Sequence, residues 1–212
     1  MRSYFLNNKI WSEFLELLNS GHYDQLISAA KPFLKTNGKR AELWELIGIA
    51  LLRKGDLKNA ERHLKKSLKI NPSKASAQFN LANAYFSGGQ FEAAANAFAR
   101  YLKRYPADKT ALLHFGRALL NSNQADRSKI HFQALAEADT QNPIVWFVLA
   151  QSYKNVGQLP EAVNSYRAAV EVDPKFEEAW FNLRNLHRDI DENAEALSLS
   201  LIHISEPTRQ SL

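Results

Sequence analysis

Residues 41–74 read AELWELIGIALLRKGDLKNAERHLKKSLKINPSK. Apolar residues recur three and four positions apart before Gly55 and again after it, which is the spacing of two amphipathic helices. Glycine tolerates the left-handed backbone with which a helix often ends, so the chain is expected to reverse at Gly55. Pro72 then closes the second helix. The segment therefore predicts an antiparallel pair, with helices near residues 41–54 and 57–70.

The turn position returns with a period of 34 residues. Glycine, asparagine or aspartate occupies it six times, at Gly21, Gly55, Gly89, Asn123, Gly157 and Asp191. In three copies a tryptophan stands eleven residues before the turn, at Trp44, Trp146 and Trp180. An unrelated helical bundle would not keep these residues in phase, so the pattern predicts a repeat array with a tight turn in each of six units.

Two further positions keep the same phase. Five residues after the turn stands a small residue in most copies, and four positions later on the same helical face stands a large one. The first set is Ala60, Ala94, Ser128, Ala162 and Ala196, with Leu26 in the first copy, and the second set is Leu64, Phe98, Phe132 and Tyr166. Small residues also occupy one position of the first helices, at Gly48, Ala82, Gly116 and Ala150. This pattern predicts helices that pack closely in pairs.

These residues resemble the tetratricopeptide repeat family, whose pattern places Trp, Leu, Gly, Tyr, Ala, Phe, Ala and Pro at fixed positions. The match is close in residues 41–74, 75–108 and 143–176 and weaker in 109–142, where Ser128 and Thr140 replace alanine and proline. Residues 1–40 hold a degenerate N-terminal repeat, either a cap or an ordinary repeat that has drifted, with Pro32 inside its second helix. The resemblance implies an all-α fold, a right-handed superhelix (α-solenoid) of antiparallel helix pairs.

The pattern fails after residue 198. Residues 177–198 are interpreted as a truncated repeat, because Ser200, His203 and Thr208 stand where an apolar residue, a small residue and proline are expected. Residues 199–209, LSLIHISEPTR, resemble a translated sequencing-library adapter. We therefore expect residues 199–212 to be a non-native tail on a truncated chain, and the alternative is a natural, divergent cap.

Composition excludes several classes of function. The 212 residues include no cysteine, which excludes thiol catalysis, disulfides and thiolate zinc sites. No run approaches the ~20 apolar residues of a membrane span, and the N-terminus lacks the apolar core of a signal peptide. These observations predict a cytoplasmic protein without a membrane span.

The net charge of +5 is concentrated at one end of the chain. Residues 1–74 hold 14 Lys and Arg against 7 Asp and Glu, whereas residues 75–198 hold 12 against 14. A basic stripe follows one face of a second helix, at Lys58, Arg62, Lys65, Lys66 and Lys69. A solvated outer face is the favoured interpretation, and contact with an acidic protein or a membrane surface is the alternative. Aromatic residues are not interleaved with the stripe, so no nucleic acid is expected as a partner.

No motif indicates catalysis. Residues 87–90, SGGQ, form an interhelical turn and lack the lysine and hydroxyl residue of a phosphate-binding loop. There is no nucleophile elbow and no His-Glu-x-x-His pair, and no two histidines stand four residues apart. We expect no metal, no cofactor and no enzymatic activity from this chain by itself.

The resemblance implies that the first helices line a concave face where ligands bind. Amide side chains recur on that face and can pair with the backbone of an extended peptide whatever its sequence, while apolar residues beside them can receive its side chains. The predicted peptide-binding residues are Phe79, Asn80, Asn83, Leu113, Arg117, Phe147, Gln151, Phe181, Asn182 and Asn185. The competing interpretation is that these asparagines only solvate the helices.

The family's clamp for chaperone C-termini is not expected. That clamp needs lysine, asparagine, asparagine, lysine and arginine at set positions, and the copy beginning at Ala41 offers Glu45, Ile49, Asn80, Thr110 and His114. We therefore predict a scaffold that binds a protein or an extended peptide in a concave groove. The alternative is that the array recruits substrate for a larger sulfotransferase or glycosyltransferase, of which it would be the N-terminal part.

Overall fold

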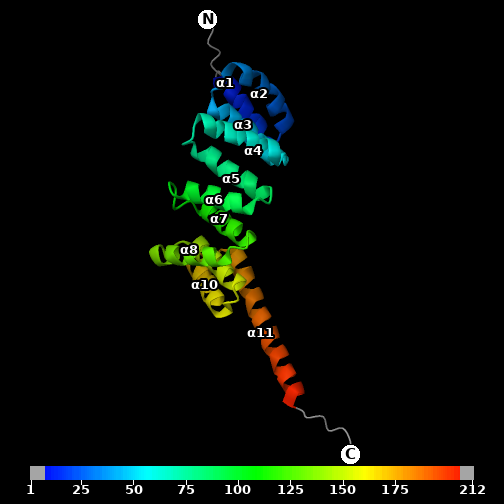
Figure 1. The fold of residues 1–212 in the computed structure, drawn as a ribbon, viewed down its shortest axis with the longest axis vertical. Coiled ribbons are helices and arrows are strands. Elements are labelled where there is room, and N and C mark those ends of the chain that lie inside the picture. Colours follow the sequence, from blue (N-terminus) through cyan, green and yellow to red (C-terminus); the bar gives the residue numbers. More distant parts are fainter. Residues whose placement is uncertain (1–7, 206–212) are drawn as a thin grey trace, which may run out of the picture. The chain divides into compact units, whose positions relative to one another are not determined.

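The computed structural model describes the backbone of residues 8–205 and the side chains of residues 8–191. Within this part the chain forms eleven α-helices and no strand (Figure 1). The helices are α1 (Asn8–Asn19), α2 (Tyr23–Asn37), α3 (Ala41–Lys54), α4 (Leu57–Ile70), α5 (Ala75–Ser87), α6 (Phe91–Leu102), α7 (Lys109–Asn121), α8 (Ala125–Ala138), α9 (Pro143–Asn155), α10 (Leu159–Val172) and α11 (Glu177–Ser205). The helices predicted at 41–54 and 57–70 are confirmed as α3 and α4.

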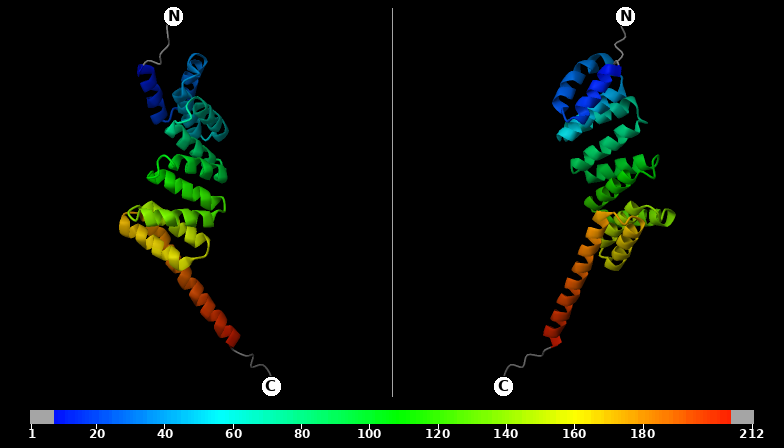
Figure 2. Two further views of the ribbon diagram at one scale, coloured as in Figure 1. Left: turned by 60° about the vertical axis from the view of Figure 1, so that its left-hand side comes forward. Right: turned by 180° about the vertical axis from the view of Figure 1, so that it is seen from behind.

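The helices belong to two compact units. The first unit comprises residues 1–122, with α1 to α7, and the second comprises residues 123–212, with α8 to α11. Within each unit, helices that follow one another in sequence pack side by side, as for α3 with α4, α5 with α6, and α9 with α10 (Figure 2). The predicted fold class, an all-α solenoid of helix pairs, is confirmed.

Five of the six predicted turns have a left-handed residue at the expected position. Gly21, Gly55, Gly89 and Gly157 have φ between 71° and 87°, and Asn123 has φ 59°. At Gly55 the backbone N–H donates to carbonyl oxygens of the last turn of α3, which caps that helix. A side chain would strain this backbone conformation, which explains why glycine marks the repeat.

The sixth turn, predicted at Asp191, is wrong. Helix α11 continues through Asp191 and ends at Ser205 as a single helix. The residues that follow Asp191, ENAEAL, favour a helix and contain neither glycine nor proline to end it. Residues 206–212 of the predicted tail and residues 1–7 of the predicted N-terminal repeat lie outside the described part of the chain.

The packing positions inferred from the 34-residue period are buried. The small-residue position is fully buried at Ala60, Ala94, Ser128 and Ala162, and so is the large-residue position at Leu64, Phe98, Phe132 and Tyr166. A Cβ added at Gly48 would lie 2.8 Å from Cγ of Leu64, so the small residue allows α3 and α4 to approach. The polar replacement Ser128 finds a partner at Ser152, with 2.7 Å between the two hydroxyl oxygens.

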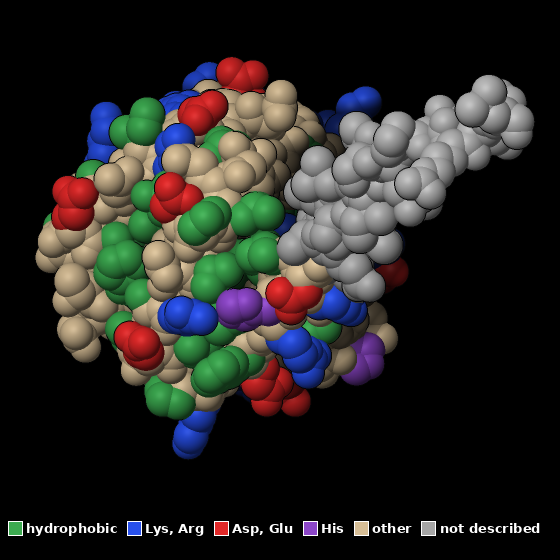
Figure 3. Space-filling view, turned by 90° about the horizontal axis from the view of Figure 1, so that it is seen from below, with side chains coloured by type: hydrophobic (Ala, Val, Ile, Leu, Met, Phe, Trp, Pro, Cys, Tyr) green, Lys and Arg blue, Asp and Glu red, His purple; other side chains and the backbone are tan. Residues whose placement is uncertain are grey.

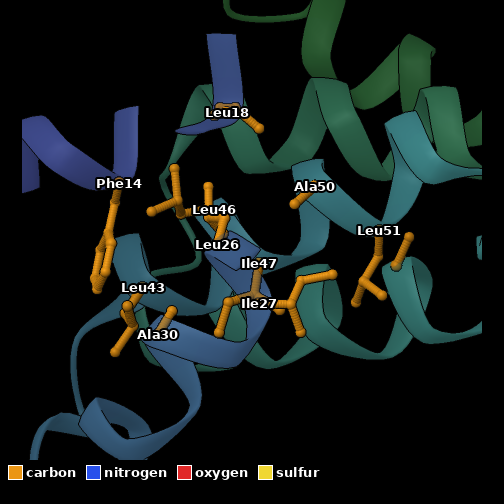
Figure 4. Close-up of a cluster of buried hydrophobic side chains, with 11 residues drawn as sticks. Phe14, Leu18, Leu26, Ile27, Ala30, Leu43, Leu46, Ile47, Ala50 and Leu51 are labelled. Carbon is orange, nitrogen blue, oxygen red and sulfur yellow. The ribbon is translucent and has the colours of Figure 1, made fainter. Parts of the chain in front are cut away.

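The first helix pair packs against α3 through its own apolar cluster. Phe14, Leu26, Ile27, Leu43 and Ile47 are buried together in this cluster (Figure 4). Pro32 lies inside α2, as predicted. The degenerate first repeat therefore contributes a helix pair to the core of the first unit.

The recurring tryptophan is hydrogen-bonded to the turn that precedes its helix. Nε1 of Trp44 donates to the carbonyl of Gly38 at 2.9 Å, and Trp146 and Trp180 bond in the same way to the carbonyls of Thr140 and Pro174. In each case the acceptor lies six residues earlier. The recurring tryptophan thus fixes how one helix pair leads into the next.

No helix among the described residues is long and apolar enough to cross a membrane.

Candidate functional site

In the first unit the predicted site residues come together on two first helices. Phe79, Asn80 and Asn83 belong to α5, and Leu113 and Arg117 belong to α7. All five side chains are half-buried, and α5 contacts α7 directly. The structure therefore places amide, guanidinium and apolar groups on one pair of neighbouring helices. We call this set the α5–α7 face.

His114 of α7 contacts two residues of this face, Phe79 and Asn83. Its ring stacks against Phe79 and Phe86, with centroids 6.2 Å and 5.9 Å away, and meets the edge of Phe98 at 5.7 Å. Nδ1 of His114 lies 2.8 Å from Oδ1 of Asn83, so the imidazole N–H donates to the amide. The histidine fixes the orientation of Asn83 and leaves the amide nitrogen as the donor that a ligand could use.

The surroundings favour the neutral form of His114. Burial lowers the pKa of its imidazole, Arg117 lowers it further, and Asp108 opposes them. A neutral ring with a proton on Nδ1 is the tautomer that the Asn83 carbonyl requires. The hydrogen bond to Asn83 and the lowered pKa therefore both indicate a neutral imidazole at His114.

Asp108 positions α7 beneath this arrangement. As the N-cap residue it accepts from the backbone N–H of Ala111 at 2.9 Å, and its other oxygen accepts from the Tyr101 hydroxyl at 2.8 Å. Burial and this contact raise the pKa of Tyr101 to about 12. The Tyr101 ring in turn packs 5.5 Å from Phe79. The start of α7 and the aromatic part of the face are thus held by one side chain.

In the second unit the predicted residues are less uniform. Phe147 of α9 is fully buried between Tyr166 and Phe176, with centroids 5.8 Å and 4.9 Å away, so it supports the surface and offers none to a ligand. Phe181 of α11 is 55% exposed, and the Arg184 guanidinium lies 5.7 Å from its ring. Figure 3 looks at the molecule from below and shows hydrophobic side chains among charged ones on that face.

The amides of the second unit differ in what they contact. Nδ2 of Asn182 donates to the Glu178 carbonyl in its own helix at 2.7 Å, which matches the solvating interpretation. Oε1 of Gln151 is buried without a hydrogen bond in the described structure. The side chains of Asn185 in this unit and Asn80 in the first are half-buried, and neither has a hydrogen bond to the described residues.

An ion pair between Lys154 Nζ and Asp189 Oδ2, 3.7 Å apart, links α9 to α11 within the second unit.

Sequence models of the family match most of the chain. Two models described as tetratricopeptide repeat match residues 51–109, 89–152 and 12–75, and one described as TPR repeat matches residues 150–187. The chain belongs to the tetratricopeptide repeat (TPR) family. Comparison with curated proteins gave no match.

Solved structures of TPR proteins are similar to this chain. One is YrrB, described as a TPR protein with an unusual peptide-binding site, with a TM-score of 0.66 at 17% identity over 81% of this chain and 88% of YrrB. A MamA protein has a TM-score of 0.67 at 21% identity, covering 78% of this chain and 90% of MamA. MamA from Desulfovibrio magneticus has a TM-score of 0.59 at 22% identity, covering 81% and 97%. At these identities the similarity shows the fold.

The predicted TPR site did not include His114. The 34-residue period could have identified it, because His114 stands one repeat after Asn80. What the period could not show is that its ring would stack between Phe79 and Phe86 and bond to Asn83. Among the residues that the structure describes, no group of three His, Cys, Asp or Glu side chains could hold a metal ion.

Proposed function

We propose that this TPR chain is a protein-interaction scaffold that binds an extended peptide along the α5–α7 face. The observation that carries the proposal is the combination of half-buried polar groups with apolar ones on adjacent helices. Asn80, Asn83 and Arg117 supply donors and acceptors, and Phe79 and Leu113 supply apolar area. A preformed surface of this kind loses little entropy when it binds.

The hydrogen-bond inventory supports a ligand at this face. Asn80 has no partner among the described residues, and Asn83 uses its carbonyl oxygen for His114 and keeps its two amide protons. Peptide backbones present carbonyl oxygens at regular intervals along an extended strand, and amide protons can meet them regardless of sequence. Similarity to YrrB, a TPR protein with a peptide-binding site, points the same way. In the second unit, Gln151 and Asn185 offer amides of the same kind.

The test is a binding measurement on the intact chain. A peptide selected on the wild-type protein from a random display library serves as the fluorescent probe. Replacing Asn80, Asn83 and Arg117 together by alanine removes three hydrogen-bonding groups, each worth about 0.5–1.5 kcal/mol, so the affinity should fall about 100-fold. Asn96→Ala with Arg100→Ala, exposed on the second helix α6, is the matched control and should leave affinity unchanged.

Circular dichroism should show that helicity is retained in both variants. Undiminished affinity in the triple variant would refute the α5–α7 face as the binding site. Equal loss in the triple variant and in the α6 control would place the peptide elsewhere and refute it as well.

A further inference from the structure

A groove lined by α2, α3 and α4 of the first unit has a composition that the repeat pattern does not demand. It has a volume of about 600 Å³ and is lined by Lys31 and Leu34 of α2, Trp44 of α3, and Arg62, His63, Lys65, Lys66 and Lys69 of α4. We call it the Trp44 groove. None of its residues belongs to the α5–α7 face, so it is a separate surface.

The bottom of the Trp44 groove is apolar and fixed in place. The indole of Trp44 is held by its bond to the Gly38 carbonyl, and it packs on the His63 ring with centroids 5.4 Å apart. Leu34 and the aliphatic stems of the lysines complete this floor. Such a floor can bury one apolar or aromatic side chain of a ligand.

The rim carries a concentration of positive charge. Lys65 is paired with Glu61 at 2.6 Å, so its charge is largely compensated. In the described structure no carboxylate forms an ion pair with Lys31, Arg62, Lys66 or Lys69. Lys66 Nζ lies 5.8 Å above the Trp44 ring. Four cations therefore surround an apolar floor without an acidic partner.

A second tryptophan in the same chain shows that these cations are not required by the fold. Trp146 stands three repeats after Trp44 and makes the same bond to a carbonyl six residues earlier, at 3.0 Å. At the positions equivalent to Lys31, Arg62, His63, Lys66 and Lys69, the Trp146 repeat has Gln133, Asn164, Ser165, Ala168 and Glu171. The repeat folds with either set, so the cations of the Trp44 groove call for another explanation.

We propose that the Trp44 groove binds an acidic peptide segment of a partner protein, with an apolar or aromatic side chain of that segment on Trp44. Four uncompensated cations match several carboxylates, and the indole matches one apolar side chain. Single-stranded nucleic acid fits less well, because it uses a series of stacking rings and the groove provides a single indole. A membrane surface fits less well, because the apolar groups lie at the bottom of a groove and do not protrude from the protein surface.

The probe is a fluorescein-labelled peptide of eight residues, alternating aspartate and glutamate with one central phenylalanine. Wild-type protein should bind it, and Lys31→Glu, Lys66→Glu and Lys69→Glu combined should weaken binding about 50-fold at low salt, because three attractions become repulsions. The matched control is Lys58→Glu, Lys103→Glu and Lys109→Glu, three exposed lysines of the same unit outside the groove. It carries the same change in net charge and should shift affinity by less than about threefold.

Two further measurements test which side chain of the peptide contributes to binding and where the peptide binds. Replacing the central phenylalanine of the probe by serine should weaken binding about tenfold, since the apolar floor is no longer covered. In ¹H–¹⁵N spectra the indole N–H signal of Trp44, assigned through Trp44→Phe, should move on titration while that of Trp146 stays in place. The Asn83→Ala and Arg117→Ala variant should bind this probe normally, which separates the outcome from that for the α5–α7 face.

Equal loss of affinity in the two charge-reversal variants would overturn the proposal, because only overall charge would then matter. An unmoved Trp44 signal would overturn it too. So would binding of an oligothymidine strand or of vesicles of phosphatidylserine and phosphatidylcholine through the groove lysines when the acidic peptide does not bind.

Discussion

Trp44 of the first unit and Trp146 of the second occupy the same repeat position and make the same hydrogen bond, yet their surroundings carry different charge. Around Trp44 the second helix α4 contributes Arg62, Lys66 and Lys69. At the equivalent positions of the Trp146 repeat, helix α10 has Asn164, Ala168 and Glu171. The repeat determines which positions of the two second helices are equivalent. It does not determine which side chains stand at those positions.

This difference shows which residues are structural. A feature shared by both sites, such as the bond from the indole to the preceding turn, belongs to the fold. A feature of one site, such as the uncompensated cations beside Trp44, is free to serve binding. The same reasoning applies to Phe79 and Phe147, which share a position although Phe79 is half-buried and Phe147 is fully buried.

The largest expected effect tests the shared part of the comparison. Trp44→Ala and Trp146→Ala should each lower the free energy of unfolding by about 2 kcal/mol, less than for a fully buried tryptophan because each ring is half-exposed. Thermal and urea unfolding followed by circular dichroism measures both. If Trp44→Ala were destabilising and Trp146→Ala harmless, the hydrogen bond from the indole to the preceding turn would not be a common structural element.

The regular part of the fold could be predicted because its signals are local. Gly55 and Pro72 fix the ends of helices through backbone conformation alone, and the helices predicted at 41–54 and 57–70 are α3 and α4. Asp191 shows the limit of this reasoning. Its phase with the glycines suggested a turn, but neighbouring helix-forming residues determine the conformation, and α11 continues.

The candidate sites could be predicted only in part, because side-chain partners lie far apart in sequence. His114 and Asn83 are separated by 31 positions, and Lys31 and Trp44 come from different helix pairs. Phe147 was predicted to face a ligand from its position, but Phe176, in the segment before α11, covers it. A 34-residue period identifies equivalent positions and says nothing about which neighbour covers each of them.

A gain-of-function variant tests the charge difference itself. The starting chain carries Lys31→Glu, Lys66→Glu and Lys69→Glu. In it, the substitutions Asn164→Arg, Ala168→Lys and Glu171→Lys give the Trp146 repeat counterparts of three of the four cations, Arg62, Lys66 and Lys69. Binding of the acidic probe should improve about tenfold, since three attractions are restored beside an indole. The measurements are fluorescence anisotropy and the indole N–H signal of Trp146. Affinity that stays at the level of the parent variant would show that cations beside a tryptophan are insufficient.

The smallest expected effect concerns His63, whose counterpart beside Trp146 is Ser165. Burial lowers the pKa of His63, and Arg62 and Lys31 add to this, while its contact with the Asn59 carbonyl and the charge of Asp56 oppose it. In the unfolded chain histidine titrates near 6.5, so below that pH the unfolded state binds more protons and is favoured. The contribution of His63 to stability is therefore retained above about pH 6.5 and falls as the pH drops toward the lowered folded pKa.

His63→Ser and His63→Asn both remove this titration. Each variant should lose less stability than the wild type between pH 7 and pH 5, and His114 and His131, whose pKa values are also lowered by burial, keep part of the dependence in all three proteins. Urea midpoints at the two pH values measure the difference. A wild-type slope that persists in both variants would mean that His63 is equally accessible to protons in the folded and unfolded chains, and that the cations around Trp44 leave its imidazole unaffected.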